Sequence, residues 1–186
     1  MQRIVIIGNS GSGKSTHAKA LAARDGLAHL DLDTIAWQPW APTTRRALTD
    51  SALAIAAFQA GHPNWVMEGC YADLAELALA HATRLVFLNP GVEACIANCR
   101  ARPWEPHKYS SAAAQDRDLP MLVEWVRGYD TRDDEFSRRR HRDLRRGAQR
   151  RQDRIGIHLA GFLRLVDSDH RVRDVFRIQR RDVLDG

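Results

Sequence analysis

The chain has 186 residues, and its 28 lysines and arginines outnumber its 23 aspartates and glutamates to give a formal net charge of +5. This length favours a single domain, 1–186, and no apolar run approaches the ~18 residues that a membrane-spanning helix requires, so we expect no membrane partner. Three cysteines without a C-x-x-C pair argue against a disulfide framework, and we therefore expect a protein of the reducing cytoplasm.

Strand-like and helix-like segments alternate over the first hundred or so residues. Four continuous apolar runs predict buried strands, at 3–7, 27–32, 64–68 and 84–88. The segments that follow them predict helices, from residue 14 to about Arg24, from Thr43 or Thr44 to Ala60, at 74–81 and at about 91–101. The first strand begins almost at once, so no signal peptide is expected. This alternation predicts an α/β fold whose parallel sheet is covered on both faces and binds ligands at the carboxyl ends of its strands.

Beyond residue 101 the helical periodicity is lost and then returns. A polar stretch with prolines and aromatic side chains predicts a flap at about 102–118. Helical patterns resume at 119–128 and from Thr131 onward, and a last strand at 162–166 precedes a last helix at about 169–178. The sequence contains no internal repeat and no long linker, which agrees with one domain.

The segment 138–154 is strongly basic, with nine arginines against two aspartates. Such a run could bind nucleic acid electrostatically, although its only ring-bearing side chain is that of His141. The alternative is a solvated helical face. Nucleic acid is thus one candidate partner, and the lack of interleaved aromatic residues favours the solvated face.

The segment between the first strand and the first helix matches the phosphate-loop pattern G-x-x-x-x-G-K-[ST] in the strand–loop–helix context that this pattern requires. Its residues, all expected to contact a nucleotide, are Gly8, Asn9, Ser10, Gly11, Ser12, Gly13, Lys14, Ser15 and Thr16. Glycines let successive backbone N–H groups converge on phosphate oxygens, and the following helix adds its N–H groups and its positive end. Lys14 supplies a positive charge for the β- and γ-phosphates, and the Ser15 hydroxyl is placed to ligate Mg²⁺. The sequence therefore predicts binding of a nucleoside triphosphate with magnesium.

Three carboxylates follow the second and third strands. Asp31 and Asp33 are two residues apart at a strand end, so one could hold Mg²⁺ through water while the other orients an acceptor hydroxyl or takes its proton. We assign the metal to Asp31 and the acceptor to Asp33; the alternative is that both are turn and cap residues. Glu68 ends the third strand before Gly69, where it could accept hydrogen bonds from Mg²⁺-bound water. The alternative for Glu68 is an exposed residue at a strand end.

Phosphoryl transfer needs cations that offset the charge on the equatorial oxygens of the phosphate. Arg100 and Arg102 border the predicted flap and Arg132 lies beyond it, so each could reach the phosphates if the flap closes. We take Arg100 and Arg132 as the candidate catalytic arginines. In a chain with 25 arginines, the alternative for any one of them is a solvated surface.

Aromatic and cysteine side chains offer two further patterns. Trp37, Trp40 and Tyr71 flank the predicted acceptor side, where they could stack on a planar substrate such as a base, or pack in the core or in a lid. Cys95 and Cys99 are four residues apart on a predicted helix but lack a second pair of ligands. We therefore interpret the two cysteines as small buried side chains rather than as a metal site.

Together these segments resemble the small P-loop kinases of the adenylate kinase and shikimate kinase type, and more closely the adenylate kinase-related DNA topology modulation (FlaR-like) proteins. The matching pieces, within residues 1–136, are the phosphate loop 8–16, Leu32-Asp33 followed by Trp37, Trp65 through Tyr71, Arg84 through Leu88, and the flap from Arg100 through Tyr109. The resemblance implies a P-loop NTPase fold of three α-β-α layers, with a five-stranded parallel sheet of order 2-3-1-4-5. It also implies ATP and Mg²⁺ as cofactors and a flap that donates arginines.

The resemblance extends to one pair of site residues and departs at others. The spacing of Asp31 and Asp33 is similar to the Asp-x-Asp of shikimate kinases, in which the pair serves magnesium and substrate. The chain departs from the group at Glu68-Gly69, where the group usually carries Asp-Gly. It has no clear match to the arginines that hold the shikimate carboxylate or to an adenylate kinase AMP site, so neither acceptor is carried over. The group does not predict the arginine-rich segment.

Three functional hypotheses follow. The first is an ATP-dependent phosphotransferase that moves the γ-phosphate of MgATP to a small-molecule or nucleotide acceptor, which the sequence does not identify. The second is a nucleotide-dependent ATPase or regulator associated with DNA, without a small acceptor. The third is a binding module that holds a nucleotide without turnover.

Overall fold

The computed structural model describes residues 1–39, 41–106 and 109–150. The chain divides into a unit of Met1–Arg146 and a second unit of Gly147–Gly186, and the sheet and all the labelled helices belong to the first. The strand predicted at 162–166, the helix predicted at 169–178 and the end of the arginine-rich segment lie outside the described residues. The single-domain organisation stays a prediction.

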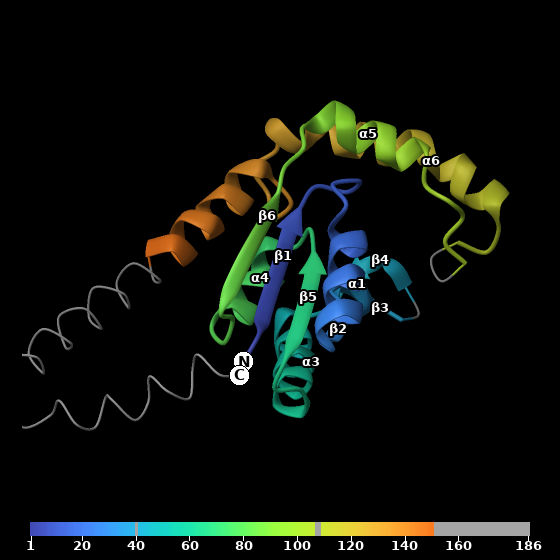
Figure 1. The fold of residues 1–186 in the computed structure, drawn as a ribbon. Helices are drawn as coiled ribbons and strands as arrows, with labels where there is room; N and C mark the ends of the chain where they lie inside the picture. Colours follow the sequence, from blue (N-terminus) through green and yellow to red (C-terminus); the bar gives the residue numbers. More distant parts are fainter. Residues whose placement is uncertain (40, 107–108, 151–186) are drawn as a thin grey trace, which may run out of the picture. The chain divides into compact units, whose positions relative to one another are not determined.

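A four-stranded parallel sheet forms the centre of the first unit (Figure 1). Its strands are β1 (Arg3–Gly8), β2 (Ala28–Asp31), β5 (Trp65–Gly69) and β6 (Arg84–Leu88), in the spatial order β2-β5-β1-β6. All three neighbouring pairs are parallel. β1, β2, β5 and β6 are the first, second, third and fourth of the strands predicted from the sequence. Numbered in that way, they lie in the order 2-3-1-4, which confirms the first four strands of the predicted order. The fifth strand of the predicted order lies outside the described residues.

Helices cover both faces of the sheet, which confirms the three-layer α-β-α architecture (Figure 1). They are α1 (Lys14–Asp25), α2 (Asp33–Ala36), α3 (Leu48–Gly61), α4 (Ala72–Leu79), α5 (Val92–Arg100) and α6 (Ala112–Arg127), followed by the 3₁₀ turn η1 (Gly128–Asp130) and the helical residues 138–150. Alternate side chains of β1 point to opposite faces: Ile4 and Ile6 pack with α1, whereas Val5 and Ile7 pack with α3 and α4. Burial on both faces explains why β1 is a continuous apolar run. Within the described part of the chain, no helix is both long and apolar enough to cross a bilayer.

The segment after α2 differs from the prediction of a loop and an early helix. Trp37–Gln38 (β3) and Ala41–Arg45 (β4) form an antiparallel pair, and α3 begins at Leu48 rather than at Thr43 or Thr44. A two-stranded pair consists of edge strands only, and edge strands tolerate proline because not every backbone N–H has to donate. The prolines therefore correctly excluded a helix here, but they did not exclude a strand.

Helix α6 begins at Ala112, within the segment that the sequence assigned to a flap. The side chain of Ser111 caps this helix by accepting a hydrogen bond from the backbone N–H of Ala114 at 3.1 Å. Pro120 lies inside the helix, and the charged side chains before it hid the helical periodicity. The loop prediction was therefore wrong for the helical part of this segment. That the preceding residues act as a flap stays a prediction.

Candidate active site

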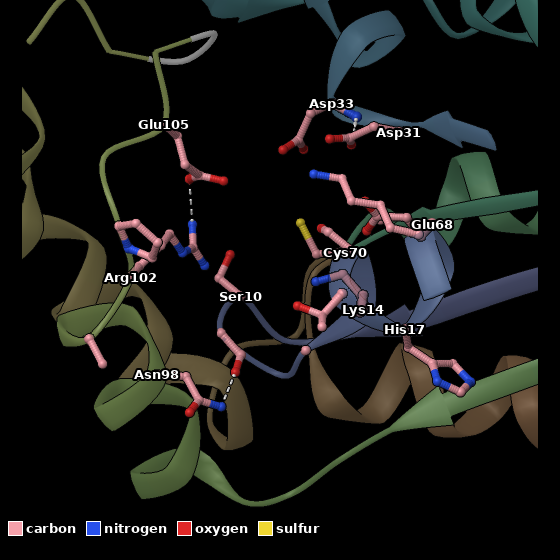
Figure 2. Close-up of a pocket in the computed structure, with 18 of the residues that line it drawn as sticks. Ser10, Lys14, His17, Asp31, Asp33, Glu68, Cys70, Asn98, Arg102 and Glu105 are labelled. Atoms are coloured by element: carbon pink, nitrogen blue, oxygen red, sulfur yellow. Dashed lines mark hydrogen bonds and ion pairs between the residues drawn. The ribbon is translucent and has the colours of Figure 1, made fainter. Parts of the chain in front are cut away.

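A cavity of about 860 Å³ lies at the carboxyl ends of β1, β2 and β5 (Figure 2). Ligands bind at this edge of a parallel sheet, and the volume is in the upper part of the ~300–1,000 Å³ range of small-molecule sites. Its lining combines phosphate-loop residues, the three predicted carboxylates and the segment after α5, and it includes Ser10, Gly11, Gly13, Lys14, Ser15, Thr16, Asp31, Asp33, Glu68, Arg102, Trp104 and Glu105. The structure thus brings together six of the nine phosphate-loop residues with the carboxylates that the sequence assigned to metal and acceptor. Gly8, Asn9 and Ser12 do not line the cavity, and their contact with a nucleotide stays a prediction.

The glycines of the phosphate loop serve two purposes. A Cβ atom on Gly8 would lie 2.3 Å from the backbone oxygen of Leu88, and one on Gly11 would lie 2.2 Å from that of Cys95. The loop therefore packs against β6 and α5 too closely for any side chain. Gly13 has φ +88, and a Cβ there would meet no described atom within 4 Å. The loop is therefore tightly packed at Gly8 and Gly11, whereas the position of the Gly13 side chain faces open space.

Helix α1 begins at the cavity, and no described side chain caps its N-terminus. The first N–H groups of a helix lack intrahelical partners and carry partial positive charge, which suits a phosphate. Lys14 is 8% exposed, and its Nζ donates a hydrogen bond to the backbone oxygen of Asn9 at 3.0 Å. The strand–loop–helix order that the motif requires is therefore confirmed, with a buried cation held inside the loop.

Two asparagines hold the loop against α5 and α6. Asn9 Nδ2 donates to the backbone oxygen of Val126 at 3.1 Å. Asn98 Nδ2 donates to the backbone oxygen of Gly11 at 2.8 Å (Figure 2). One bond runs from the loop to α6 and the other from α5 to the loop, so two helices that lie far along the chain fix the position of the loop. A single asparagine on a helix forms no recognisable motif, so sequence reasoning missed Asn98.

The two cysteines of α5 have a packing role. Cys95 and Cys99 are free thiols buried with Val123 and Val126 between α5 and α6, and burial raises the pKa of both. This confirms their interpretation as small buried side chains. Across the described residues, no three His, Cys, Asp or Glu side chains group to hold a metal. The predicted magnesium site is of another kind, because it combines a hydroxyl with two carboxylates and water.

Strand register places Asp31 beside Glu68, since the two are partners in the β2–β5 pair. Asp31 Oδ1 accepts a hydrogen bond from the backbone N–H of Asp33 at 2.9 Å, and the Asp31 backbone oxygen accepts one from Thr34 Oγ1 at 2.7 Å. Asp31 therefore forms the turn that starts α2, as the alternative interpretation held, and it also lines the cavity. Its contact with magnesium stays a prediction.

Glu68 is 2% exposed, so its interpretation as an exposed strand end is wrong. Its Oε1 has no hydrogen-bond partner among the described residues and lies 3.8 Å from His29 Nε2. Burial disfavours the charged form of Glu68, but His29, Lys14 and Ser15 together outweigh burial and hold the pKa of this carboxyl below its usual value. A buried carboxylate oxygen with spare accepting capacity, beside a lysine and a serine hydroxyl, fits Mg²⁺ and its water.

A hydrogen-bond chain that sequence reasoning missed connects Asp33 to two of the aromatic residues. The Tyr71 hydroxyl donates to Asp33 Oδ1 at 2.5 Å, and Trp37 Nε1 donates to the Tyr71 hydroxyl at 2.7 Å. The rings of Trp37 and Tyr71 are edge to face, with centroids 6.2 Å apart. Burial raises the pKa of Tyr71, and the neighbouring Asp33 raises it further. Trp37 and Tyr71 thus follow the packing interpretation, whereas Trp40 lies outside the described residues.

The three candidate arginines separate in the structure. Arg102 lines the cavity and forms an ion pair with Glu105 at 3.0 Å (Figure 2). Arg100 is exposed at the end of α5 and does not line this cavity. Arg132 also lies outside its lining, with its guanidinium 4.0 Å from the centroid of the Trp125 ring. The catalytic roles of Arg100 and Arg132 stay predictions, and Arg102 is the one of the three that lines the cavity.

A buried histidine, His141, contacts Cys70, which lines the cavity. His141 is fully buried, with Nε2 2.9 Å from the backbone oxygen of Cys70 and Nδ1 2.7 Å from the Tyr129 hydroxyl. A carbonyl only accepts, so Nε2 carries the proton and Nδ1 accepts from Tyr129. Burial lowers the pKa of His141 to about 4.

The arginines of the helical residues 138–150 make protein contacts of their own. Arg138 pairs with Asp130, and Arg140 pairs with Glu76, both at 3.3 Å. These are exposed ion pairs of the kind found on solvated helical faces.

No family model matches the chain, and no curated protein sequence matches it. Similar solved structures include a shikimate kinase from Acinetobacter baumannii in complex with shikimate, at 21% identity and a TM-score of 0.41, covering 85% of this chain and 94% of that one. A sugar kinase from Janibacter sp. shows 16% identity and a TM-score of 0.41, and the match covers 74% of this chain and 82% of the sugar kinase. A gluconokinase from Sinorhizobium meliloti shows 19% identity and a TM-score of 0.39, and the match covers 82% of this chain and 97% of the gluconokinase. None of the three is a DNA topology modulation protein, so that finer resemblance stays a prediction.

Proposed function

We propose that this chain is a phosphotransferase that binds MgATP in the cavity and moves the γ-phosphate to a small-molecule acceptor. One observation carries the proposal: a phosphate loop with a buried lysine faces three carboxylates across the same cavity. A module that only holds MgATP needs carboxylates for the metal alone, whereas a transferase also needs a group for the acceptor, and Asp33 is the carboxylate that we assign to it.

The residues of the loop bind and orient the donor. Backbone N–H groups of residues 10–16 and the start of α1 surround the phosphates, and Lys14 neutralises charge between them. Magnesium, when bound, supplies positive charge that offsets the charge of the phosphates. Ser15 would hold the metal together with Asp31 and Glu68, the carboxylates partly through water.

The opposite wall serves the acceptor and the transferring group. Asp33 accepts a hydrogen bond from the acceptor hydroxyl, orients it, and takes its proton as the phosphoryl group is transferred. Arg102 approaches from the segment after α5 and offsets charge on the transferring phosphoryl group once its bond to Glu105 is exchanged. Trp104 of the same segment lines the cavity, and closure of this segment as the predicted flap would exclude water.

Lys14→Ala tests this function. Removing the ammonium should lower ADP release from MgATP by at least about 100-fold, since it removes a charge that acts on the reacting phosphates. Arg24→Ala is the matched control, because Arg24 is a cation on the same helix that pairs with Asp25 and is 70% exposed. Full turnover by Lys14→Ala would contradict the proposal, and an equal loss in Arg24→Ala would show that the effect is not specific to the site.

A further inference from the structure

Three residues from three elements form one hydrogen-bonded chain that ends at the cavity. Asp33 is the first residue of α2, Trp37 is the first residue of β3, and Tyr71 immediately precedes α4. The bond from Trp37 Nε1 to the Tyr71 hydroxyl is 2.7 Å long, and the bond from this hydroxyl to Asp33 Oδ1 is 2.5 Å long. Of the three, Asp33 is the one that lines the cavity.

The chemistry of the indole fixes the direction of this chain. An indole N–H only donates, so the Tyr71 oxygen has to accept from Trp37 and its own proton has to point at Asp33. A hydrogen bond donated to a carboxylate is stronger than a bond between neutral groups. Tyr71 therefore fixes the position of Asp33 Oδ1.

The tyrosine ring is itself held on several sides. Tyr71 is 2% exposed, and its ring lies edge to face with Phe136 at 5.3 Å. The guanidinium of Arg45 lies 4.8 Å from the centre of the same ring and pairs with Asp73 at 2.8 Å. These contacts leave the hydroxyl little freedom to leave Asp33, because the side chain cannot swing about its Cα–Cβ bond without breaking them.

We propose that Tyr71 is a positioning residue that holds the Asp33 carboxylate in one orientation toward the acceptor hydroxyl, with Trp37 directing the tyrosine proton. The inference rests on the proposed function. Tyr71 acts through Asp33 and contacts neither the donor nor the acceptor. Asp33, held in this way, orients the hydroxyl of the acceptor, which is the kind of positioning that phosphoryl transfer relies on.

Tyr71→Phe removes the donated bond and keeps the ring. The assay is phosphate release from MgATP with water as the acceptor. We expect kcat to fall about 10- to 100-fold, because one hydrogen bond to a charged group is lost, and we expect KM for ATP to stay unchanged. In the Asp33→Asn background, Tyr71→Phe should cost nothing further in kcat. Trp37→Phe, which leaves the bond to Asp33 in place, should cause a smaller loss in the same direction.

Tyr129→Phe is the matched control for the loss of a buried hydroxyl. Tyr129 is 1% exposed, and its hydroxyl lies 2.7 Å from His141 Nδ1, away from Asp33. This variant should lose stability while its kcat stays within about twofold of wild type. A kcat loss equal to that of Tyr71→Phe would show that any buried hydroxyl has the effect, and it would overturn the inference.

Urea unfolding without nucleotide supplies a second readout that does not depend on turnover. Tyr71→Phe should lower the folding equilibrium constant about 5- to 50-fold more in the wild-type background than in the Asp33→Asn background. A smaller effect of Tyr71→Phe in the Asp33→Asn background than in the wild-type background, for both stability and kcat, supports the inference; we call this difference coupling. Coupling in stability alone means a structural bond, and additive losses in both cycles mean that the bond is not formed; either result overturns the positioning role.

The two proposals fail in distinguishable ways. If wild-type protein shows no Lys14-dependent turnover, the proposed function is wrong and the positioning role falls with it. If turnover depends on Lys14 but Tyr71→Phe leaves kcat unchanged, the proposed function stands and the inference about Tyr71 is wrong.

Discussion

Gly11→Ala tests whether the phosphate loop packs as closely on α5 as the structure shows. A Cβ at Gly11 would lie 2.2 Å from the backbone oxygen of Cys95 and 2.8 Å from Cys99 Sγ, so the loop or the helix has to move. Overpacking of this kind costs about 1–3 kcal/mol. Gly11 also has φ +76, where alanine is less stable than glycine by roughly 1–2 kcal/mol. We therefore expect a total loss of about 2–5 kcal/mol in the free energy of unfolding.

Gly13→Ala separates the two contributions. Gly13 has φ +88, but no described atom lies within 4 Å of its would-be Cβ, so only the backbone term of roughly 1–2 kcal/mol applies. Urea unfolding of both variants without nucleotide gives the comparison. Gly11→Ala should be less stable than Gly13→Ala by about 1–3 kcal/mol. Equal losses in the two variants would refute the close packing of the loop on α5.

Three further predictions concern the surroundings of the loop. Burial lowers the pKa of His141 from 6.5 to about 4, so as the pH falls the unfolded state takes up a proton before the folded state does. The free energy of unfolding of wild type, measured relative to His141→Gln, should therefore fall by about 3 kcal/mol between pH 7 and pH 4. An unchanged difference would contradict the buried neutral imidazole. Ser111→Ala should cost about 1 kcal/mol in urea unfolding, whereas the neighbouring Ser110→Ala should cost much less; similar losses would argue against the cap on α6. Asn98→Ala should weaken MgATP binding about 2- to 10-fold in titration calorimetry, and unaltered affinity would show that the bond to Gly11 does not shape the loop.

The phosphate loop and the sheet around it were predictable because their signals are local. Residues 8–16 carry the whole motif in one segment, and β1 is a continuous apolar run because both of its faces are buried. Asp31, Asp33 and Glu68 reached the same cavity because the carboxyl ends of parallel strands meet at one edge of a sheet. Local pattern and sheet geometry together were enough for this half of the site.

The remaining features depend on contacts between distant segments. Tyr71 is 38 residues from Asp33, and nothing in either segment predicts that the two bond. Asn98 is 87 residues from Gly11 and lies on an ordinary amphipathic helix. The arginines were ambiguous because their positions depend on where α5 and α6 run, and the structure places Arg102 at the cavity but not Arg100. Pairings of this kind are set by tertiary packing, which single-sequence periodicity does not encode.

Acceptor-stimulated release of ADP from MgATP tests the central claim most directly. The panel would hold nucleoside monophosphates, shikimate, gluconate and other small alcohols, each measured against water alone and against Lys14→Ala. The account predicts that at least one acceptor class raises ADP release above the water background in wild type and not in Lys14→Ala. Release that depends on Lys14 but ignores every acceptor would contradict a phosphotransferase and indicate an ATPase, and no release at all would indicate a nucleotide-binding module.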